Sequence, residues 1–144
     1  MTSQYDECLK KGMLRPIPPD PQNSESSMAK AKEWIVEAEK ALKGEALKAS
    51  LYSSYMAMFH ASRAVLYRDG LREKSHYCIA RYLEAEYVEK GKLEKEWVEL
   101  LDFQRETRHS TQYDVAFQAS EDDDSKAIDS AKRFVKRIGE LLKK

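Results

Sequence analysis

The distribution of proline is the feature that most constrains how this chain can fold. The four prolines are Pro16, Pro18, Pro19 and Pro21. Proline breaks a helix interior because it lacks a backbone N–H and clashes with the preceding turn. The proline-free remainder is rich in Ala, Glu, Lys and Leu, which favour helix. The sequence therefore predicts an all-α domain over residues 23–144, preceded by an extended arm over residues 1–22.

Glycine and capping residues divide the domain into about five helices. Gly44, Gly70 and Gly91 stand at predicted helix ends, because glycine tolerates the left-handed conformation found there. Ser120 suits the start of the last helix, with Asp123 at the capping-box position. The helices are predicted over residues 24–43, 45–69, 75–89 and 92–109, and from about residue 120 onward. The short connections predict an up-and-down helical bundle.

Composition narrows the classes of function. The 144 residues include 25 Lys and Arg and 25 Asp and Glu, so the formal net charge is zero. A nucleic-acid role would therefore depend on a local patch and not on an overall positive field. The chain has no DNA-specific motif, and no apolar run reaches the roughly 20 residues that a membrane span needs. We expect no membrane partner.

The cysteines and histidines predict neither a disulfide framework nor a metal site. Cys8 and Cys78 are far apart and form no CxxC unit. Because the N-terminus lacks the apolar segment of a secretory signal, we expect a cytoplasmic protein with reduced cysteines. His60, His76 and His109 lie on three predicted helices without metal-ligand spacing. No glycine-rich phosphate loop occurs, so no metal or cofactor is expected.

The helix predicted over residues 45–69 has two notable faces. One broad apolar arc marks it as the central helix of the bundle. A flanking arc carries Met56, His60, Arg63 and Tyr67, a mixture typical of interface cores. This arc either extends the core or forms a second buried seam, as a homodimer interface or the wall of a cleft.

The helix predicted over residues 92–109 changes character at its end. Its apolar face continues into Gln104, Thr107 and Arg108, and a buried arginine is costly unless it is paired or faces a cleft. The polar segment contains Arg105, Arg108, His109, Tyr113 and Asp114. Arginine suits phosphate, histidine moves protons near neutral pH, and tyrosine donates to phosphate or stacks on a base. The alternative is a frayed helix end with Arg108 paired to Asp114.

Three segments carry a resemblance to a known family. They are Tyr-Met-Ala-Met-Phe-His-Ala at residues 55–61, Arg-Ala-Val-Leu at residues 63–66, and Gly70 followed by Lys74-Ser75-His76. They resemble the signature helix of the HEPN superfamily (higher eukaryote and prokaryote nucleotide-binding domains), and a weaker similarity extends over residues 29–142. The resemblance implies a short helical bundle that acts as a homodimer. It also implies a minimal nucleotidyltransferase partner in a toxin–antitoxin-like pair, with a nucleotide or RNA site between protomers.

The same resemblance bears on catalysis. Active HEPN ribonucleases carry an arginine, four to six further residues, and then a histidine. Four residues separate Arg108 from Tyr113, so Tyr113 stands in the place of that histidine. The chain therefore resembles the HEPN subgroup with an Arg-x-x-x-x-Tyr-Asp end, a degenerate form of the ribonuclease motif, and we expect binding of a nucleotide or RNA in place of cleavage. The alternatives are an active metal-independent endoribonuclease, with Arg108, His109 and Tyr113 as candidate catalytic residues, and a dimeric interaction module without a ligand.

The predicted nucleotide or RNA site gathers residues from three helices. Its members are His60, Arg63, Lys74, His76, Arg105, Arg108, Tyr113 and Asp114. Lys74 and His76 enter because an anion could dock at the start of the helix over residues 75–89, although Ser75 could simply cap it. The last helix also has a basic face, made of Lys132, Arg133, Lys136, Arg137 and Lys143. That face is expected to be a solvated surface, with RNA contact as the alternative.

Overall fold

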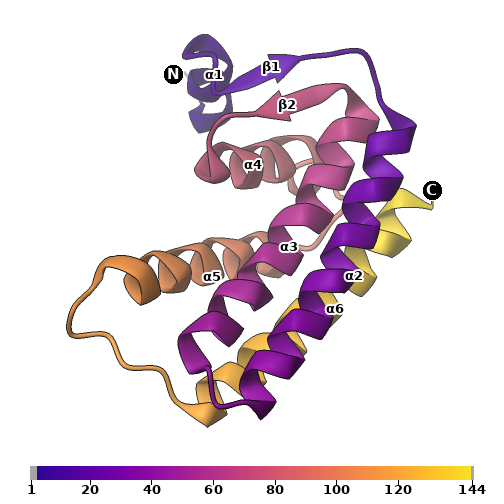
Figure 1. The fold of residues 1–144 in the computed structure, drawn as a ribbon. Helices are drawn as coiled ribbons and strands as arrows, with labels where there is room; N and C mark the ends of the chain where they lie inside the picture. The colour runs from indigo at the N-terminus through magenta and orange to yellow at the C-terminus, as the bar shows by residue number, and fades with distance from the viewer. Residues whose placement is uncertain (1–2, 144) are drawn as a thin grey trace.

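The structure is a computed structural model, and it describes residues 3–143. Figure 1 shows a bundle made almost entirely of helices. The four long helices are α2 (Pro21–Lys43), α3 (Leu47–Asp69), α5 (Lys95–Tyr113) and α6 (Glu121–Leu142). The shorter elements are α1 (Gln4–Lys10), α4 (His76–Leu83), the π-helical turn η1 (Glu84–Val88), and the strands β1 (Leu14–Pro16) and β2 (Leu71–Glu73). The predicted all-α bundle is confirmed.

Helix α3 is the central element, as its broad apolar arc predicted. It packs against α2, α5 and α6 (Figure 1), and Tyr55 and Met58 on it are fully buried. Small serines let α2 and α3 approach closely. Ser24 Oγ donates to the Ala64 carbonyl at 2.7 Å, and Ser50 Oγ donates to the Ala38 carbonyl at 3.0 Å. These bonds satisfy buried hydroxyls while holding the two helices in register.

The helix boundaries follow local capping chemistry. Asp20 caps α2 by accepting from the Asn23 N–H at 2.9 Å, and Pro21 occupies the first helical position, where a missing N–H costs nothing. Ser120 caps α6 by accepting from the Asp123 N–H at 3.1 Å, as predicted. The helix predicted over residues 75–89 differs, because α4 ends at Leu83 and the chain continues as η1.

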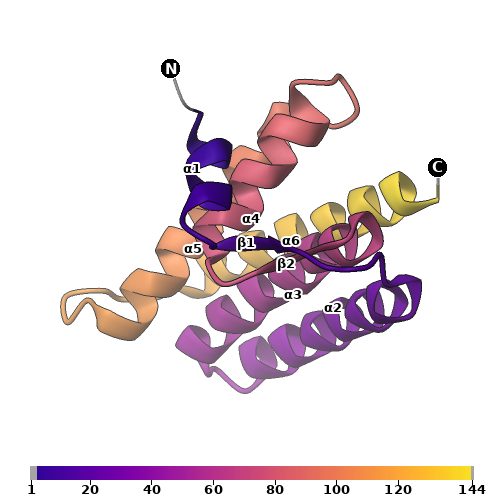
Figure 2. The same cartoon turned by 90° about the horizontal axis from the view of Figure 1, so that it is seen from above.

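The N-terminal arm contains more structure than the extended segment that the prolines predicted. Residues 4–10 form α1, and β1 pairs antiparallel with β2, placing Leu14 opposite Glu73. Leu14 is buried in the core, which anchors the arm. Figure 2 shows α1 lying over α4, with β1 and β2 crossing the molecule side by side. The arm is thus a packed layer over α4 and the end of α3.

The two cysteines correct another expectation. Cys8 on α1 and Cys78 on α4 form a disulfide, with their Cα atoms 5.8 Å apart. The prediction that they remain reduced and unpaired is wrong, because folding of the arm brings together two residues separated by 70 positions. Within residues 3–143, no helix combines the length and apolar character needed to cross a membrane.

Replacing Gly70 with alanine is expected to destabilise the fold by about 2 kcal/mol. Gly70 ends α3 with φ at 85°, and a Cβ there would lie 2.8 Å from the Ile17 carbonyl oxygen. The variant therefore strains the backbone and displaces the arm. Urea unfolding monitored by circular dichroism measures the change. Gly139→Ala is the control, since its Cβ meets only Met28 Cε at 3.6 Å, and equal effects of the two variants would contradict this account.

Candidate functional site

Helices α3, α4 and α5 bring polar and aromatic side chains together around Tyr55. The Tyr55 cluster consists of Tyr55, Phe59 and Arg63 from α3, His76 from α4, and Arg108 from α5. Figure 1 shows α4 and α5 both lying against α3, which explains how residues far apart in the sequence meet. The cluster combines aromatic surface with two arginines and a histidine.

His76 is held by hydrogen bonding and by stacking. The Tyr55 hydroxyl lies 2.8 Å from His76 Nδ1, and the imidazole stacks on Phe59 with ring centroids 4.2 Å apart. Burial raises the pKa of Tyr55 well above its usual value, so its hydroxyl keeps its proton; it donates to Nδ1 or accepts from Nδ1–H according to the tautomer of His76. Burial, together with the nearby Arg108 charge, lowers the pKa of His76. At neutral pH the imidazole is therefore neutral, and in the tautomer whose Nδ1 accepts from Tyr55 its Nε2–H is available as a donor.

Two arginines near the cluster are neutralised by carboxylates. Arg63 Nε donates to Glu73 Oε1 at 2.7 Å while its guanidinium lies over the Phe59 ring. Arg105 Nη1 donates to Asp102 Oδ1 at 2.5 Å, and Arg81 pairs with the other oxygen of the same carboxylate. Each guanidinium thus has a partner in its own protomer, which reduces its attraction for an external anion.

Arg108 differs from these arginines because it makes no ion pair with any of residues 3–143. Its guanidinium carbon lies 5.4 Å from the centre of the Tyr55 ring, and Nη1 donates to Gln112 Oε1 at 3.0 Å. The Nε atom is buried and has no hydrogen-bond partner among the described residues. The alternative pairing with Asp114 is not formed, because Asp114 Oδ1 accepts from the Ala116 N–H instead. Arg108 therefore keeps its charge for a ligand.

The remaining predicted site residues lie outside the Tyr55 cluster. His109 and Tyr113 pack on each other with ring centroids 4.8 Å apart, and Tyr113 is 68% exposed. Asp114 and Lys74 are also exposed. His60 borders the cluster through an edge contact with Phe59, and burial lowers its pKa to about 4. The structure thus gathers His60, Arg63, His76 and Arg108 and separates them from the end of α5.

Four residues that matter to the site were not among its predicted members, and one of them is Phe59, on which His76 stacks. Tyr55 positions His76, while Glu73 and Asp102 neutralise the flanking arginines. Tyr55 belongs to the apolar arc of α3, so it was expected in the core and not in the site. The HEPN-like segment at residues 55–61, which begins with Tyr55, was the sequence signal that could have identified it. Asp102 stands three residues before Arg105 on one helix, so its pairing with Arg105 had a local signal, whereas nothing local indicates the pairing of Glu73 with Arg63.

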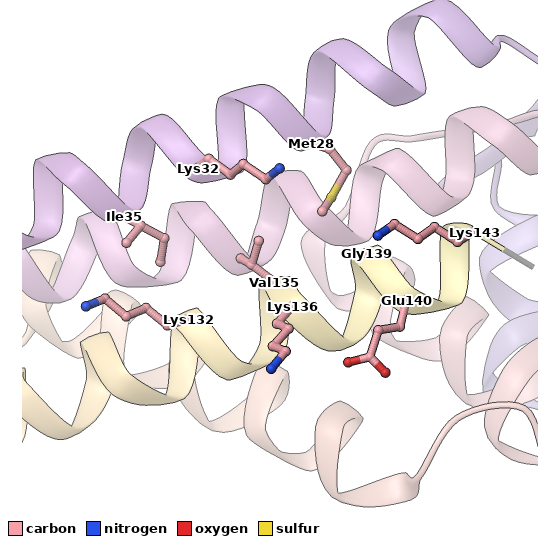
Figure 3. A pocket seen from close by; sticks show the side chains of 9 residues that line it. All are labelled: Met28, Lys32, Ile35, Lys132, Val135, Lys136, Gly139, Glu140 and Lys143. Carbon is pink, nitrogen blue, oxygen red and sulfur yellow. The ribbon is translucent and has the colours of Figure 1, made fainter.

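A hollow away from the Tyr55 cluster lies between α2 and α6, and Figure 3 shows the side chains around it. It has a volume of about 470 Å³, an apolar floor of Met28, Ile35 and Val135, and lysines at its rim. The lysines are Lys32, Lys132, Lys136 and Lys143. Lys132 bonds Glu39 at 3.0 Å, and Glu140 adds a negative charge to the rim. The basic face of α6 is thus partly neutralised, and RNA contact there stays a prediction.

The side chains of the Tyr55 cluster are of the kind that bind an anion. Residues 3–143 contain no group of three or more His, Cys, Asp or Glu side chains placed to hold a metal ion. Arg108, which has no ion pair within residues 3–143, supplies positive charge, and the neutral imidazole of His76 contacts the same Tyr55 ring. A planar guanidinium forms bidentate bonds with phosphate oxygens. The arrangement therefore suits a phosphate group.

Comparison with known proteins identifies the family. The family model described as "HEPN domain" matches residues 24–141. The match runs from the first turns of α2 to the last turn of α6 and includes all five residues of the Tyr55 cluster. No curated protein matches the chain. Because the match covers most of the sequence, the chain belongs to the HEPN domain family.

Proposed function

We propose that this HEPN domain protein binds the phosphate group of a nucleotide or of RNA at the Tyr55 cluster. The observation that carries the proposal is Arg108, whose guanidinium is half-buried and makes no ion pair within residues 3–143. Leaving a buried polar nitrogen without a partner costs about 1–3 kcal/mol. A phosphate group at the accessible part of the guanidinium would supply the counter-charge that Arg108 lacks within residues 3–143.

The residues in and around the Tyr55 cluster have different roles in the proposed binding. Arg108 supplies the charge, the Nε2–H of His76 supplies a donor, and Tyr55 orients the imidazole through its hydroxyl. Arg63 and Arg105 retain their carboxylate partners and form the walls. This arrangement binds a dianion through directed bonds and not through a broad positive field, in agreement with the zero net charge of the chain.

The proposal includes partners. Exposed apolar side chains occur along and after α5, namely Phe103, Tyr113 and Val115. Exposed apolar residues that gather along one segment support a protein contact. Together with the family resemblance, they support a homodimer and a minimal nucleotidyltransferase partner in a toxin–antitoxin-like pair. Sedimentation equilibrium at tens of micromolar tests the dimer, and a monomer at that concentration would contradict it. The cytoplasmic location also stays a prediction.

An active metal-independent endoribonuclease is the second candidate. It is favoured by His76, which is neutral at physiological pH; in the tautomer whose Nδ1–H donates to the Tyr55 hydroxyl, Nε2 is free to accept a proton. In that case an arginine would stabilise charge on the phosphate in the transition state. Incubation of the protein with RNA in EDTA tests this candidate. Cleavage lost in His76→Ala would assign that residue as the base, and cleavage lost in His109→Ala would assign His109. Absence of cleavage would leave binding alone.

Replacing Arg108 with leucine is expected to reduce phosphate binding at least tenfold. The variant removes a charge-assisted bidentate contact while retaining the apolar contact with the Tyr55 ring. Isothermal titration with pyrophosphate and with ribose 5-phosphate measures the change. Arg133→Leu is the matched control, because Arg133 lies on exposed α6 surface and pairs with Asp129 at 3.1 Å. Unchanged affinity in Arg108→Leu, or an equal loss in the control, would overturn the proposed site.

A further inference from the structure

A hollow of about 320 Å³ lies between α3, α5, α6 and the connection that joins α5 to α6. The residues that define it are Leu51, Phe103, Gln104, Thr107, Phe117 and Lys126. Figure 1 shows this long connection arching away from the end of α5 before it reaches α6. The hollow shares no lining residue with the Tyr55 cluster or with the lysine-rimmed groove of Figure 3.

Gln104 is the polar group that gives this hollow its chemistry. Its side chain is only 4% exposed, and its Oε1 atom is buried without a hydrogen-bond partner among residues 3–143. A native core pairs nearly all such atoms, because an unpaired one costs about 1–3 kcal/mol. The amide therefore favours a ligand that brings its own donor into the hollow.

The side chains that line the hollow indicate the shape of that ligand. Phe103 is 62% exposed at the hollow, and Phe117 is half-buried beside it. Exposed aromatic faces stack on flat heterocycles, whatever their ring type. The rim carries a small excess of negative charge, since Lys126 pairs with Asp122 at 2.9 Å and Asp123 adds a second carboxylate. The interior thus suits a neutral, planar, donor-bearing group and does not suit a phosphate.

The hollow is one helical turn from Arg108. Gln104 and Arg108 are four residues apart on α5, so they share a face and are separated by about 6 Å of axial rise. The same step on α3 leads from Leu51, which lines the hollow, to Tyr55, which lies under the Arg108 guanidinium. Moving one turn along both helices therefore leads from the aromatic hollow to the unpaired arginine. A ribose spans the interval between a base and its 5′-phosphate.

We propose that this hollow binds the base of the nucleotide whose phosphate Arg108 holds, an inference that rests on the proposed function. The Gln104 amide reads the hydrogen-bonding edge of the base, and Phe103 and Phe117 stack against its faces. The protein is thereby a reader of nucleobases and not only of phosphate. Its natural ligand is a nucleoside monophosphate unit, free or within a single-stranded RNA.

The test compares ligands with and without a base in the wild-type protein and in Gln104→Leu. The probes for isothermal titration are AMP, GMP, CMP, UMP and ribose 5-phosphate. We expect at least one monophosphate to bind at least tenfold more tightly than ribose 5-phosphate, and Gln104→Leu to abolish that advantage without changing ribose 5-phosphate binding. Leucine preserves side-chain volume and removes an unpaired polar atom, so the variant should melt at or above the wild-type temperature. Gln22→Leu, on the exposed start of α2, is the control.

The outcomes separate the two proposals. If Arg108 governs ribose 5-phosphate binding but no base adds affinity, the phosphate site stands and the base site is wrong. If the base advantage survives in Gln104→Leu, the base lies elsewhere and the inference is overturned. Adenosine, guanosine, cytidine and uridine lack phosphate, so titrations with these four nucleosides test the base site independently of Arg108. Nucleoside binding that Gln104→Leu abolishes and Arg108→Leu preserves would support the base site even if the phosphate site failed, and no binding of any probe would overturn both.

Discussion

Breaking the Cys8–Cys78 disulfide is expected to lower the free energy of unfolding by about 4 kcal/mol. The bond closes a loop of 70 residues, so it removes a large share of the conformational freedom of the unfolded chain. It also joins α1 to α4, whose first residue is His76. We expect a chain with both cysteines changed to alanine to unfold at a lower urea concentration than the oxidised wild type.

Reductant provides the internal control for this prediction. Wild-type protein in dithiothreitol should shift to the midpoint of the double variant, whereas the double variant should not respond to dithiothreitol. Unfolding monitored by tryptophan fluorescence measures both midpoints, because the chain has two tryptophans. Coincident curves for oxidised and reduced wild type would show that the loop constraint contributes little. A shift of the double variant in dithiothreitol would show that the reductant acts elsewhere.

The disulfide illustrates what sequence reasoning missed in the fold. The proline-free stretch and the glycine positions predicted the long helices, because helix-breaking and capping are local properties. The packing of residues 4–16 is not local. It depends on the pairing of β1 with β2 and on burial of Leu14, and both need α3 and α4 to be in place. Neither cysteine carries a nearby signal for a partner at a distance of 70 residues.

The predicted site shows the same division between local and tertiary information. The polar segment near the end of α5 drew attention to Arg108, and helix phase accounts for what was misplaced. At about 100° per residue, Tyr113 is rotated about 140° from Arg108, so the two side chains face different directions. Gln112, four residues after Arg108, shares its face and forms the observed hydrogen bond. Applied to this segment, the helical wheel would have separated Tyr113 from Arg108 within one protomer.

The distinction between Arg108 and its neighbours was only partly available from the sequence, because Asp102 and Arg105 are three residues apart on one helix, whereas Glu73 reaches Arg63 through the fold. Arg63, Arg105 and Arg108 have the same side chain, and each stands on a predicted helix. What differs is the arrival of Glu73 beside Arg63 and of Asp102 beside Arg105. Whether an arginine of this site can attract an external anion thus depends on whether a carboxylate lies beside its guanidinium. This is why Arg108, and not the number of basic residues, supports the proposed phosphate site.

Asp124 provides the second large expected effect, because its carboxylate is completely buried. The residue has 0% exposure, and neither Oδ atom has a hydrogen-bond partner among the described residues. Burial raises the pKa of Asp124 to about 6, above the ordinary value of 3.8. The folded chain therefore binds a proton between about pH 4 and pH 6 that the unfolded chain has released. Folding is then favoured as the pH falls through this window, and the ionised group opposes folding above it.

Asp124→Asn is expected to raise the free energy of unfolding by about 3 kcal/mol at pH 7.5, from about 1.4 kcal/mol for each unit of pKa shift. Asparagine keeps the shape of the side chain without the buried charge, so the gain should shrink toward zero as the pH falls to about 4. Urea unfolding of both proteins across pH 4–8 measures the difference. Glu121→Gln is the matched control, since this exposed acidic residue also lies in the first turn of α6. A constant difference across the whole range, or an equal gain in the control, would show that charge burial at Asp124 is not the cause.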